Sequence, residues 1–133
     1  MKVLSLKQPY ADLIKNKIKM IETRSWSTKY RGELYIHTSK TKINYKELRN
    51  KAVLNFINVN KCEYGAIILK CKLVDCILMT EEFINEIKQN KNEYLCGYYE
   101  IGRYAWLLSD IEIIKPIYVN GKLGIWNYNG KNK

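Results

Sequence analysis

The chain has few of the residues that build metal centres and disulfide frameworks. Its 133 residues include four cysteines and a single histidine, His37. Cys62, Cys71, Cys76 and Cys96 form no C-x-x-C pair, and one histidine does not complete a zinc site, so we expect no metal and no other cofactor. Scattered cysteines in a reducing compartment are more often buried thiols than disulfides, and we assign them no functional role.

Long apolar runs, linkers and repeats are also missing. No apolar stretch reaches the roughly 20 residues that a membrane span needs, and the N-terminus lacks a basic-then-apolar signal pattern. We therefore expect a cytoplasmic protein with no membrane association. No internal repeat or Pro/Gly-rich linker divides the chain, so we expect a single domain over residues 1–129 and a flexible C-terminal tail over residues 130–133.

Acidic residues are scarce relative to basic ones. Lys and Arg number 23 against 13 Asp and Glu, which gives a formal net charge of +10. The excess lies almost entirely in the first 51 residues, which hold 13 basic and 4 acidic side chains. Such asymmetry predicts a positive face, and polyanions such as RNA are the partners that a positive face attracts. A merely soluble basic surface is the alternative, because the many Lys, Asn, Ile and Tyr residues also suit an AT-rich coding sequence.

Hydrophobic patterns predict a small α+β domain. Strands are expected at residues 3–6, 20–26, 33–37, 66–79, 103–109 and 111–118. Helices are expected after Pro9, over residues 45–58 behind a capping-box pattern at Asn44 and Glu47, and after the capping residue Thr80. Most of these elements do not follow the order of a doubly wound sheet, so a small curled sheet or β-barrel with peripheral helices fits best.

One segment concentrates residues that suit nucleotide binding. With the two-residue period of a strand, Glu22, Arg24 and Trp26 point to one face, and Lys19 lies at its edge. Lysine can hold a phosphate, arginine can fork onto a phosphate or a base edge, glutamate can accept from an exocyclic amine, and tryptophan can stack on a base. The structural alternative is that Glu22 and Arg24 pair with neighbouring strands and that Trp26 belongs to the core.

Five ordered segments along the chain carry a family resemblance. They read LSLKQPYA at residues 4–11, KMIETRSW at 19–26, IHTSK at 36–40, GRYAWLLS at 102–109 and GKLGIW at 121–126. Together they resemble the ASCH domain, a branch of the PUA-like superfamily, over nearly the whole chain. The resemblance implies a β-barrel with surrounding helices and a cleft bordered by a G-x-K-x-x-E-x-R segment, which has been proposed to bind RNA or other nucleic acid.

Each position of the G-x-K-x-x-E-x-R motif corresponds to a residue of this chain. Its lysine, glutamate and arginine are Lys19, Glu22 and Arg24, and its glycine is replaced by Lys17. Glycine there would allow a positive φ or a close approach to the main chain, so Lys17 departs from the pattern while it adds a cation. We predict that the chain binds RNA or a nucleotide-like ligand in a basic cleft that includes these four residues and Trp26.

Enzymatic activity is the alternative. Some short ASCH proteins are amidohydrolases that remove an acyl group from a modified cytidine with the motif lysine, a threonine three residues later and a distant glutamate. Glu22 stands at the position of that threonine, and a carboxylate does not simply replace a hydroxyl nucleophile; Thr23 points to the opposite face of the strand. Ribonuclease activity has also been suggested for the family, with Lys19 and Glu22 as the candidates for acid and base.

Further candidate residues lie outside this motif. His37 and Ser39 share a predicted strand face and could line the cleft, although a hydrogen-bonded structural histidine is an equal alternative. Lys40 follows them and, together with Lys42, is expected at the electrostatic rim of the cleft. Arg103 begins a predicted strand among aromatic residues, most of which we expect in the core, and it is the surface candidate of that segment.

Overall fold

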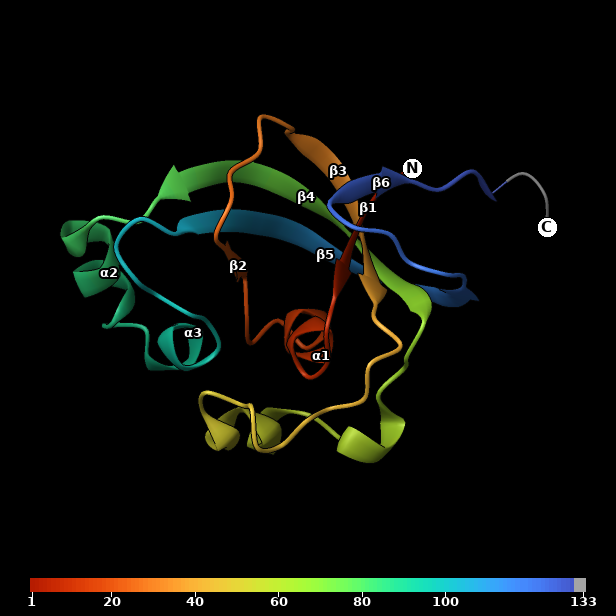
Figure 1. Ribbon diagram of the computed structural model, residues 1–133, viewed down its shortest axis with the longest axis horizontal. Coiled ribbons are helices and arrows are strands. Elements are labelled where there is room, and N and C mark those ends of the chain that lie inside the picture. Colours follow the sequence, from red (N-terminus) through yellow and green to blue (C-terminus); the bar gives the residue numbers. More distant parts are fainter. Residues whose placement is uncertain (131–133) are drawn as a thin grey trace.

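Two long antiparallel strands, β4 (Ala66–Leu78) and β5 (Tyr104–Tyr118), form the centre of the sheet. The structure is a computed structural model and describes residues 1–130. The other strands are β1 (Lys2–Leu6), β2 (Ile21–Arg24), β3 (Gly32–Thr38) and β6 (Ile125–Asn127). Their order across the sheet is β2-β5-β4-β3-β1-β6 (Figure 1). Strands β1 and β3 pair in parallel, and the other neighbours are antiparallel.

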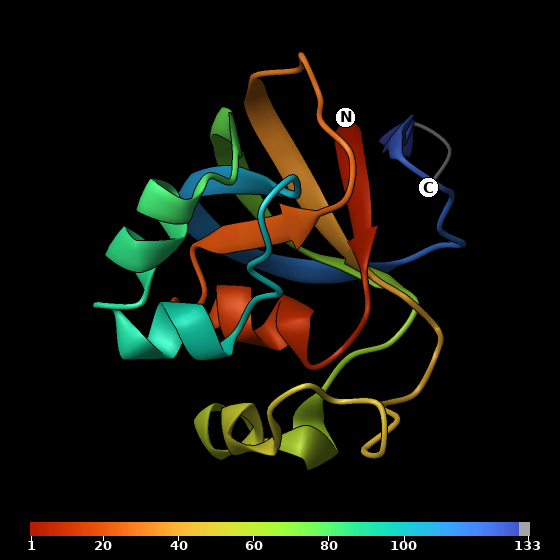
Figure 2. The same ribbon diagram turned by 60° about the vertical axis from the view of Figure 1, so that its left-hand side comes forward.

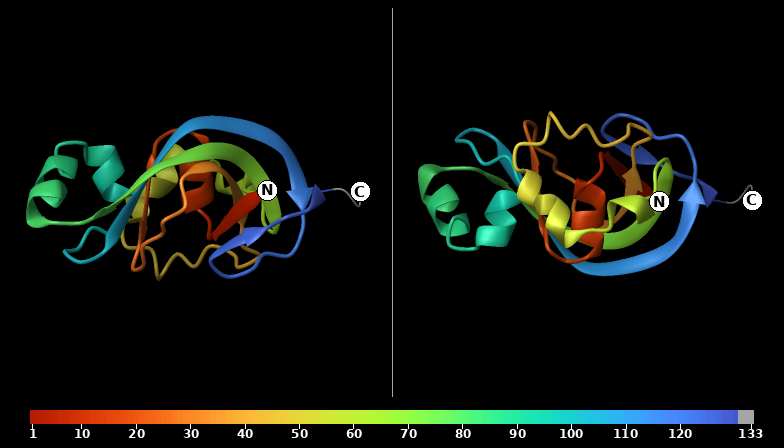
Figure 3. Two further views of the ribbon diagram at one scale, coloured as in Figure 1. Left: turned by 90° about the horizontal axis from the view of Figure 1, so that it is seen from above. Right: turned by 90° about the horizontal axis from the view of Figure 1, so that it is seen from below.

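The sheet is curled because β4 and β5 change register along their shared length. Their pairing shifts at three places, and Asp110 of β5 takes a left-handed φ of 54°. Such irregularities bend strands, and Figure 3 shows both strands curving around the inner helix. The sequence predicted separate strands at 103–109 and 111–118, whereas Asp110 lies within one continuous strand. The predicted curled sheet with peripheral helices is confirmed.

Helix α1 (Tyr10–Lys15) fills the concave side of the sheet (Figures 1 and 2). Its Ala11 and Ile14 are buried in one core cluster with Trp106 and with inward side chains of β3 and β4. Each large apolar side chain removed from water contributes about 1.5–3 kcal/mol. This packing fixes the helix, and with it the chain that leads from α1 into β2.

Two further helices, α2 (Glu81–Ile87) and α3 (Lys91–Leu95), lie at one end of the sheet beside β2 (Figure 1). Thr80 caps α2, as predicted, because its hydroxyl accepts a hydrogen bond from the Phe83 N–H. Ile84 of α2 packs in a cluster with Ile21 of β2 and the buried Met79. This cluster places α2 against β2.

The prediction of a helix over residues 45–58 is wrong. The segment is irregular in its first part and then forms the 3-10 helix Lys51–Phe56, and a second 3-10 helix, Val59–Lys61, follows it. Asn44 accepts a hydrogen bond from the main-chain N–H two residues ahead, which closes a turn instead of capping a helix. Tyr45, the first residue of the predicted apolar stripe, is exposed, so little packing is available to stabilise a longer helix.

Two absences hold for the described part of the chain. No helix within residues 1–130 is long and apolar enough to cross a membrane. Over the same residues, no group of His, Cys, Asp or Glu side chains is arranged to hold a metal ion. The tail expected at residues 130–133 lies, apart from Gly130, outside the described residues.

Candidate functional site

The curled sheet stays open between its edge strand β2 and strand β1. The two strands are not neighbours in the sheet, but Arg24 at the end of β2 donates from Nη2 to the main-chain carbonyl oxygen of Ser5 in β1 at 3.0 Å. Figure 2 shows β2 directed toward β1. A cavity of about 580 Å³ lies at this seam. Its lining comes from β1, α1, β2, the turn after α3, Ser39, Arg49, Arg103 and residues 122–124.

Two cations share one carboxylate inside the cavity. Glu22 Oε1 lies 3.5 Å from Lys19 Nζ, and Glu22 Oε2 lies 3.0 Å from Arg24 Nε. The Lys19 side chain is 1% exposed, and its ammonium also donates to the carbonyl oxygen of Ile21. A buried charge without a partner is costly, so Glu22 holds both cations in place.

Trp26 lies at the rim of the same cavity. Its ring packs edge-on against the buried Trp106, with the ring centroids 4.7 Å apart and the planes at 84°. Trp106 Nε1 donates to the carbonyl oxygen of Trp26 at 3.2 Å. Trp26 is nevertheless 36% exposed. It therefore packs on the core and offers part of its ring to the cavity.

A buried carboxylate from α3 fixes the start of β2. Glu93 accepts hydrogen bonds from the main-chain N–H groups of Met20 at 2.8 Å and Ile21 at 3.2 Å. Burial raises the pKa of the Glu93 carboxyl, while these hydrogen bonds and the charge of Lys19 oppose the rise. Glu93 is absent from the residues that the sequence predicts. The capping pattern Asn90-x-x-Glu93 is the signal that marks it, and Asn90 does cap α3.

The turn after α3 presents a tyrosine between two arginines. The Cζ atoms of Arg49 and Arg103 lie 3.6 and 4.2 Å from the centre of the Tyr98 ring. The main chain of Tyr98 is also fixed, because its N–H donates to Thr23 Oγ1 at 3.0 Å and its carbonyl oxygen accepts from Arg103 Nε at 3.0 Å. Two guanidinium groups from distant parts of the sequence are thereby brought to one side of the cavity.

Comparison with known families and structures identifies the chain. The ASCH domain model matches residues 4–121. The chain belongs to the ASCH domain family. Among solved structures it is similar to a crystal structure of a tyrosine-to-phenylalanine mutant of ZmASCH from Zymomonas mobilis, with 16% identity, a TM-score of 0.53 and coverage of 88% of this chain and 74% of that one. At this identity the likeness concerns the fold alone. None of the curated proteins matches this sequence.

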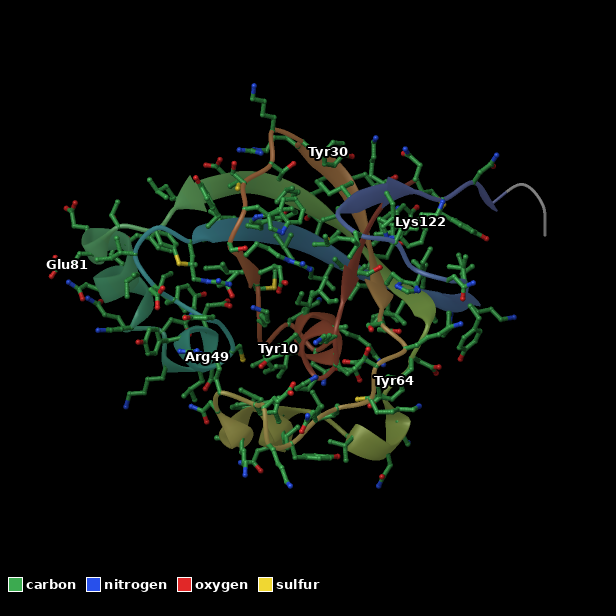
Figure 4. All side chains as sticks on the ribbon, in the orientation of Figure 1. Tyr10, Tyr30, Arg49, Tyr64, Glu81 and Lys122 are labelled. Carbon is green, nitrogen blue, oxygen red and sulfur yellow. The ribbon has the colours of Figure 1, made fainter. Side chains whose placement is uncertain are left out.

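The predicted α+β, PUA-like fold is therefore confirmed for this ASCH domain. Further side chains that line its cavity come from α1, α3 and the loop before β6. Figure 4 labels Tyr10, the first residue of α1, and Lys122 near β6. Burial and then the charge of Glu22 raise the pKa of the Tyr10 hydroxyl, which stays a hydrogen-bond donor at neutral pH. Burial raises the pKa of the Cys96 thiol to about 11, so this thiol is not a nucleophile at neutral pH.

His37 lies outside the cavity lining of the ASCH domain. Its Nε2 donates to the Val119 carbonyl oxygen at 2.7 Å, and its Nδ1 accepts from the Ser5 hydroxyl at 2.9 Å. A carbonyl can only accept, so Nε2 carries a proton, and Trp126 Nε1 donates to the same Ser5 oxygen at 3.1 Å, which leaves the Ser5 hydroxyl hydrogen for Nδ1 of a neutral imidazole. Burial lowers the pKa of His37 in agreement. His37 thus anchors the loop that carries Lys122.

Lys17 and Lys40 also lie outside the lining. Lys17 follows the C-terminal end of α1 with a φ of 62°, and its N–H donates to the Ile14 carbonyl oxygen at 2.9 Å. Glycine is favoured at this left-handed position after a helix, so the glycine of the ASCH motif fits a backbone role here. Lys40 Nζ donates to Asn120 Oδ1 at 2.6 Å, which ties the chain after β3 to the loop before β6.

The cavity brings together most, but not all, of the predicted site residues. Those in its lining are Lys19, Glu22, Arg24, Trp26, Ser39 and Arg103. Lining residues that the sequence did not single out include Lys7, Tyr10, Arg49, Tyr98 and Lys122. The family-like segments LSLKQPYA and GKLGIW contain three of them, and Arg49 lies in the wrongly predicted helix. In total the lining holds six basic side chains and one carboxylate.

Proposed function

We propose that this ASCH domain binds RNA or a nucleotide-like ligand, through its phosphate groups, in the cavity between β1 and β2. The observation that carries the proposal is the surplus of positive charge in the lining. Both oxygens of Glu22 already face Lys19 and Arg24. The ion pairs among residues 1–130 include none of the other cavity cations, which are Lys7, Arg49, Arg103 and Lys122. An anionic ligand neutralises this surplus.

The kinds of side chain support a nucleotide more than a simple anion. Arg49 and Arg103 carry planar guanidinium groups that can fork onto phosphate oxygens. The exposed part of Trp26 offers a face for base stacking, and the Tyr10 hydroxyl is a donor beside the cations. The cavity volume of 580 Å³ lies within the span of about 300–1,000 Å³ that small-ligand sites occupy. One nucleotide unit is a ligand of this class.

The groups that a hydrolase would use are engaged in other contacts. Glu22 faces a cation with each of its oxygens, and the Thr23 hydroxyl accepts the hydrogen bond from the Tyr98 N–H. The Cys96 thiol is protonated at neutral pH. These contacts favour binding over acyl transfer to a side chain. Hydrolysis of an acylated cytidine or of RNA is the competing outcome, and the experiment below measures it.

The test is binding of a fluorescein-labelled RNA, followed by anisotropy, at salt concentrations from about 50 to 200 mM. We expect the affinity to fall steeply with salt, because each phosphate that a cation neutralises releases counterions. Arg49→Gln and Lys122→Gln should each weaken binding. Lys115→Gln, which changes an exposed lysine of β5 outside the cavity, should not. Binding that is indifferent to salt, or equally weakened by all three variants, contradicts the proposal.

The same protein preparation is incubated with acylated cytidine and with RNA, and the products are separated by chromatography. We expect no turnover above that of buffer. Turnover in the normal enzyme range that Lys19→Ala abolishes would replace binding by catalysis as the function of the cavity.

A further inference from the structure

The chain between β3 and the first 3-10 helix leaves the cavity and returns to it. Ser39 and Arg49 line the cavity at the two ends of this stretch. The residues between them include three exposed lysines and Tyr45, which is 48% exposed. The exposed basic and aromatic residues of the stretch, here called the basic strip, are Lys40, Lys42, Tyr45, Lys46 and Arg49.

Contacts with neighbouring segments hold the basic strip in place. Lys42 Nζ lies 3.9 Å from the centre of the Tyr64 ring, and the Arg49 guanidinium stacks on Tyr98. Figure 4 shows Tyr64 and Arg49 on opposite sides of α1. The basic strip therefore runs past α1 and connects with the cavity at Arg49.

The positive charges of the basic strip have no carboxylate partners within residues 1–130, in contrast to Lys70 on the outer face of the sheet. There, Lys70 Nζ lies 3.7 Å from Glu33 and 3.8 Å from Glu112. None of the cations of the basic strip takes part in an ion pair among residues 1–130. Within residues 39–49 the one carboxylate is that of Glu47. The unbalanced charge thus continues from the cavity along the basic strip.

We propose that the basic strip binds the nucleotides next to the one in the cavity, so that the ligand is a single-stranded polynucleotide rather than a free nucleotide. This inference rests on the proposed function of the cavity. Phosphates along the strand neutralise the lysines and release counterions, and an unpaired base stacks on the exposed ring of Tyr45. A double helix keeps its bases stacked inside, so a single strand is the form that can present one base to the cavity and another to Tyr45.

The experiment uses the full chain and three probes: uridine 5′-monophosphate, an oligouridylate of about ten nucleotides, and a DNA of the same length and base. Calorimetry measures the monophosphate, and anisotropy measures the oligomers. The variants are Tyr45→Ala, Tyr45→Phe and the pair Lys42→Gln with Lys46→Gln. The matched control is Lys72→Gln with Lys115→Gln, which removes the same charge from exposed positions of β4 and β5. Urea unfolding checks that each variant folds.

We expect the wild-type protein to bind the oligouridylate at least about tenfold more tightly than the monophosphate. Tyr45→Ala should weaken oligomer binding about tenfold and leave monophosphate binding unchanged, while Tyr45→Phe retains the ring and the affinity. The strip lysine pair should lower the salt slope by about 2, and the control pair should not. Tighter binding of the RNA than of the DNA assigns the ligand to RNA, and the reverse order assigns it to DNA.

Two kinds of failure are distinguishable. Equal affinity for monophosphate and oligomer, no effect of Tyr45→Ala, or equal losses in the strip pair and the control pair would overturn the role of the basic strip and leave the cavity in place. If the wild-type protein binds neither the monophosphate nor the oligomers, the proposed function itself fails, and the inference about the strip fails with it.

Discussion

Replacement of Glu22 by glutamine tests the ion pairs of the cavity most directly. Glu22→Gln keeps the size of the side chain and one carbonyl oxygen but removes the charge. Lys19 and Arg24 then lose the carboxylate that lies 3.5 Å from one and 3.0 Å from the other. The main consequence is a buried Lys19 ammonium that keeps its hydrogen bond to the Ile21 carbonyl oxygen and the more distant charge of Glu93 but loses its ion-pair partner.

The magnitude follows from the burial of the three side chains. Lys19 is 1% exposed, Glu22 11% and Arg24 23%. Breaking a fully buried ion pair costs about 3–5 kcal/mol, and an exposed pair contributes about 0.2–1 kcal/mol. Solvent screens Arg24 in part, so we expect Glu22→Gln to lower the free energy of unfolding by about 2–3 kcal/mol.

Urea unfolding at neutral pH measures this loss, with Glu33→Gln as the control. Glu33 pairs with Lys70 on the outer face, where the carboxylate is more than half exposed, so its loss should stay below about 1 kcal/mol. Added phosphate should restore part of the stability of Glu22→Gln, because an anion that binds only the folded state stabilises it. If Glu22→Gln unfolds at the same urea concentration as the wild type, Lys19 and Arg24 do not depend on Glu22, and the reasoning is refuted.

Three further predictions concern the surroundings of the cavity. Lys17→Gly should raise the free energy of unfolding, measured in urea, by about 0.5–1 kcal/mol. Glycine relieves the strain of the left-handed conformation, and this gain exceeds the loss that comes from the greater conformational entropy of glycine in the unfolded state. A decrease in the free energy of unfolding would contradict this. The pKa of His37, the one histidine of the chain, should lie below its usual value of about 6.5 when measured by NMR. The free energy of unfolding should fall as the pH drops below that value, because the unfolded state binds the proton more readily. In the control variant His37→Gln this contribution to the pH dependence should be absent. Gly97→Ala should destabilise the fold by about 1–3 kcal/mol in thermal or urea unfolding, because the added Cβ would lie 2.6 Å from the Tyr99 ring; wild-type stability would show that the ring can move away.

Much of the sheet could be predicted from the sequence because strand alternation is a local signal. Glu22, Arg24 and Trp26 do line the cavity, but Thr23 and Ser25, which alternation assigned to the other face, line it as well. Strand β2 ends at Arg24, so the two-residue period does not extend to Trp26. The prediction of a helix over residues 45–58 is wrong for a physical reason. Apolar residues at helical spacing are necessary for a packed helix, but they are not sufficient. Asparagines recur through residues 44–60, and those that cap do so in tight turns and 3-10 helices rather than in an α-helix.

The rest of the site depends on contacts between distant segments. Arg49 enters the cavity because its guanidinium stacks on Tyr98, and no local pattern around either residue reports that meeting. His37 also depends on a distant segment. The sequence predicted that it lies on a strand, but its structural role follows from the loop that packs over it and supplies the Val119 carbonyl oxygen as hydrogen-bond acceptor.

The position of the cavity follows from how the sheet ends. Strand β2 is an edge strand, and the side of it that faces β1 has no strand partner. An unpaired edge has to be covered by other groups, and Arg24 does so when it donates to the Ser5 carbonyl oxygen while facing Glu22. The side chains that close the curled sheet are therefore among those that line the cavity. Glu22 carries one negative charge and contacts only two of the six cations, so the proposed anionic ligand should lessen the repulsion among the cations of the lining and thereby stabilise the closed sheet.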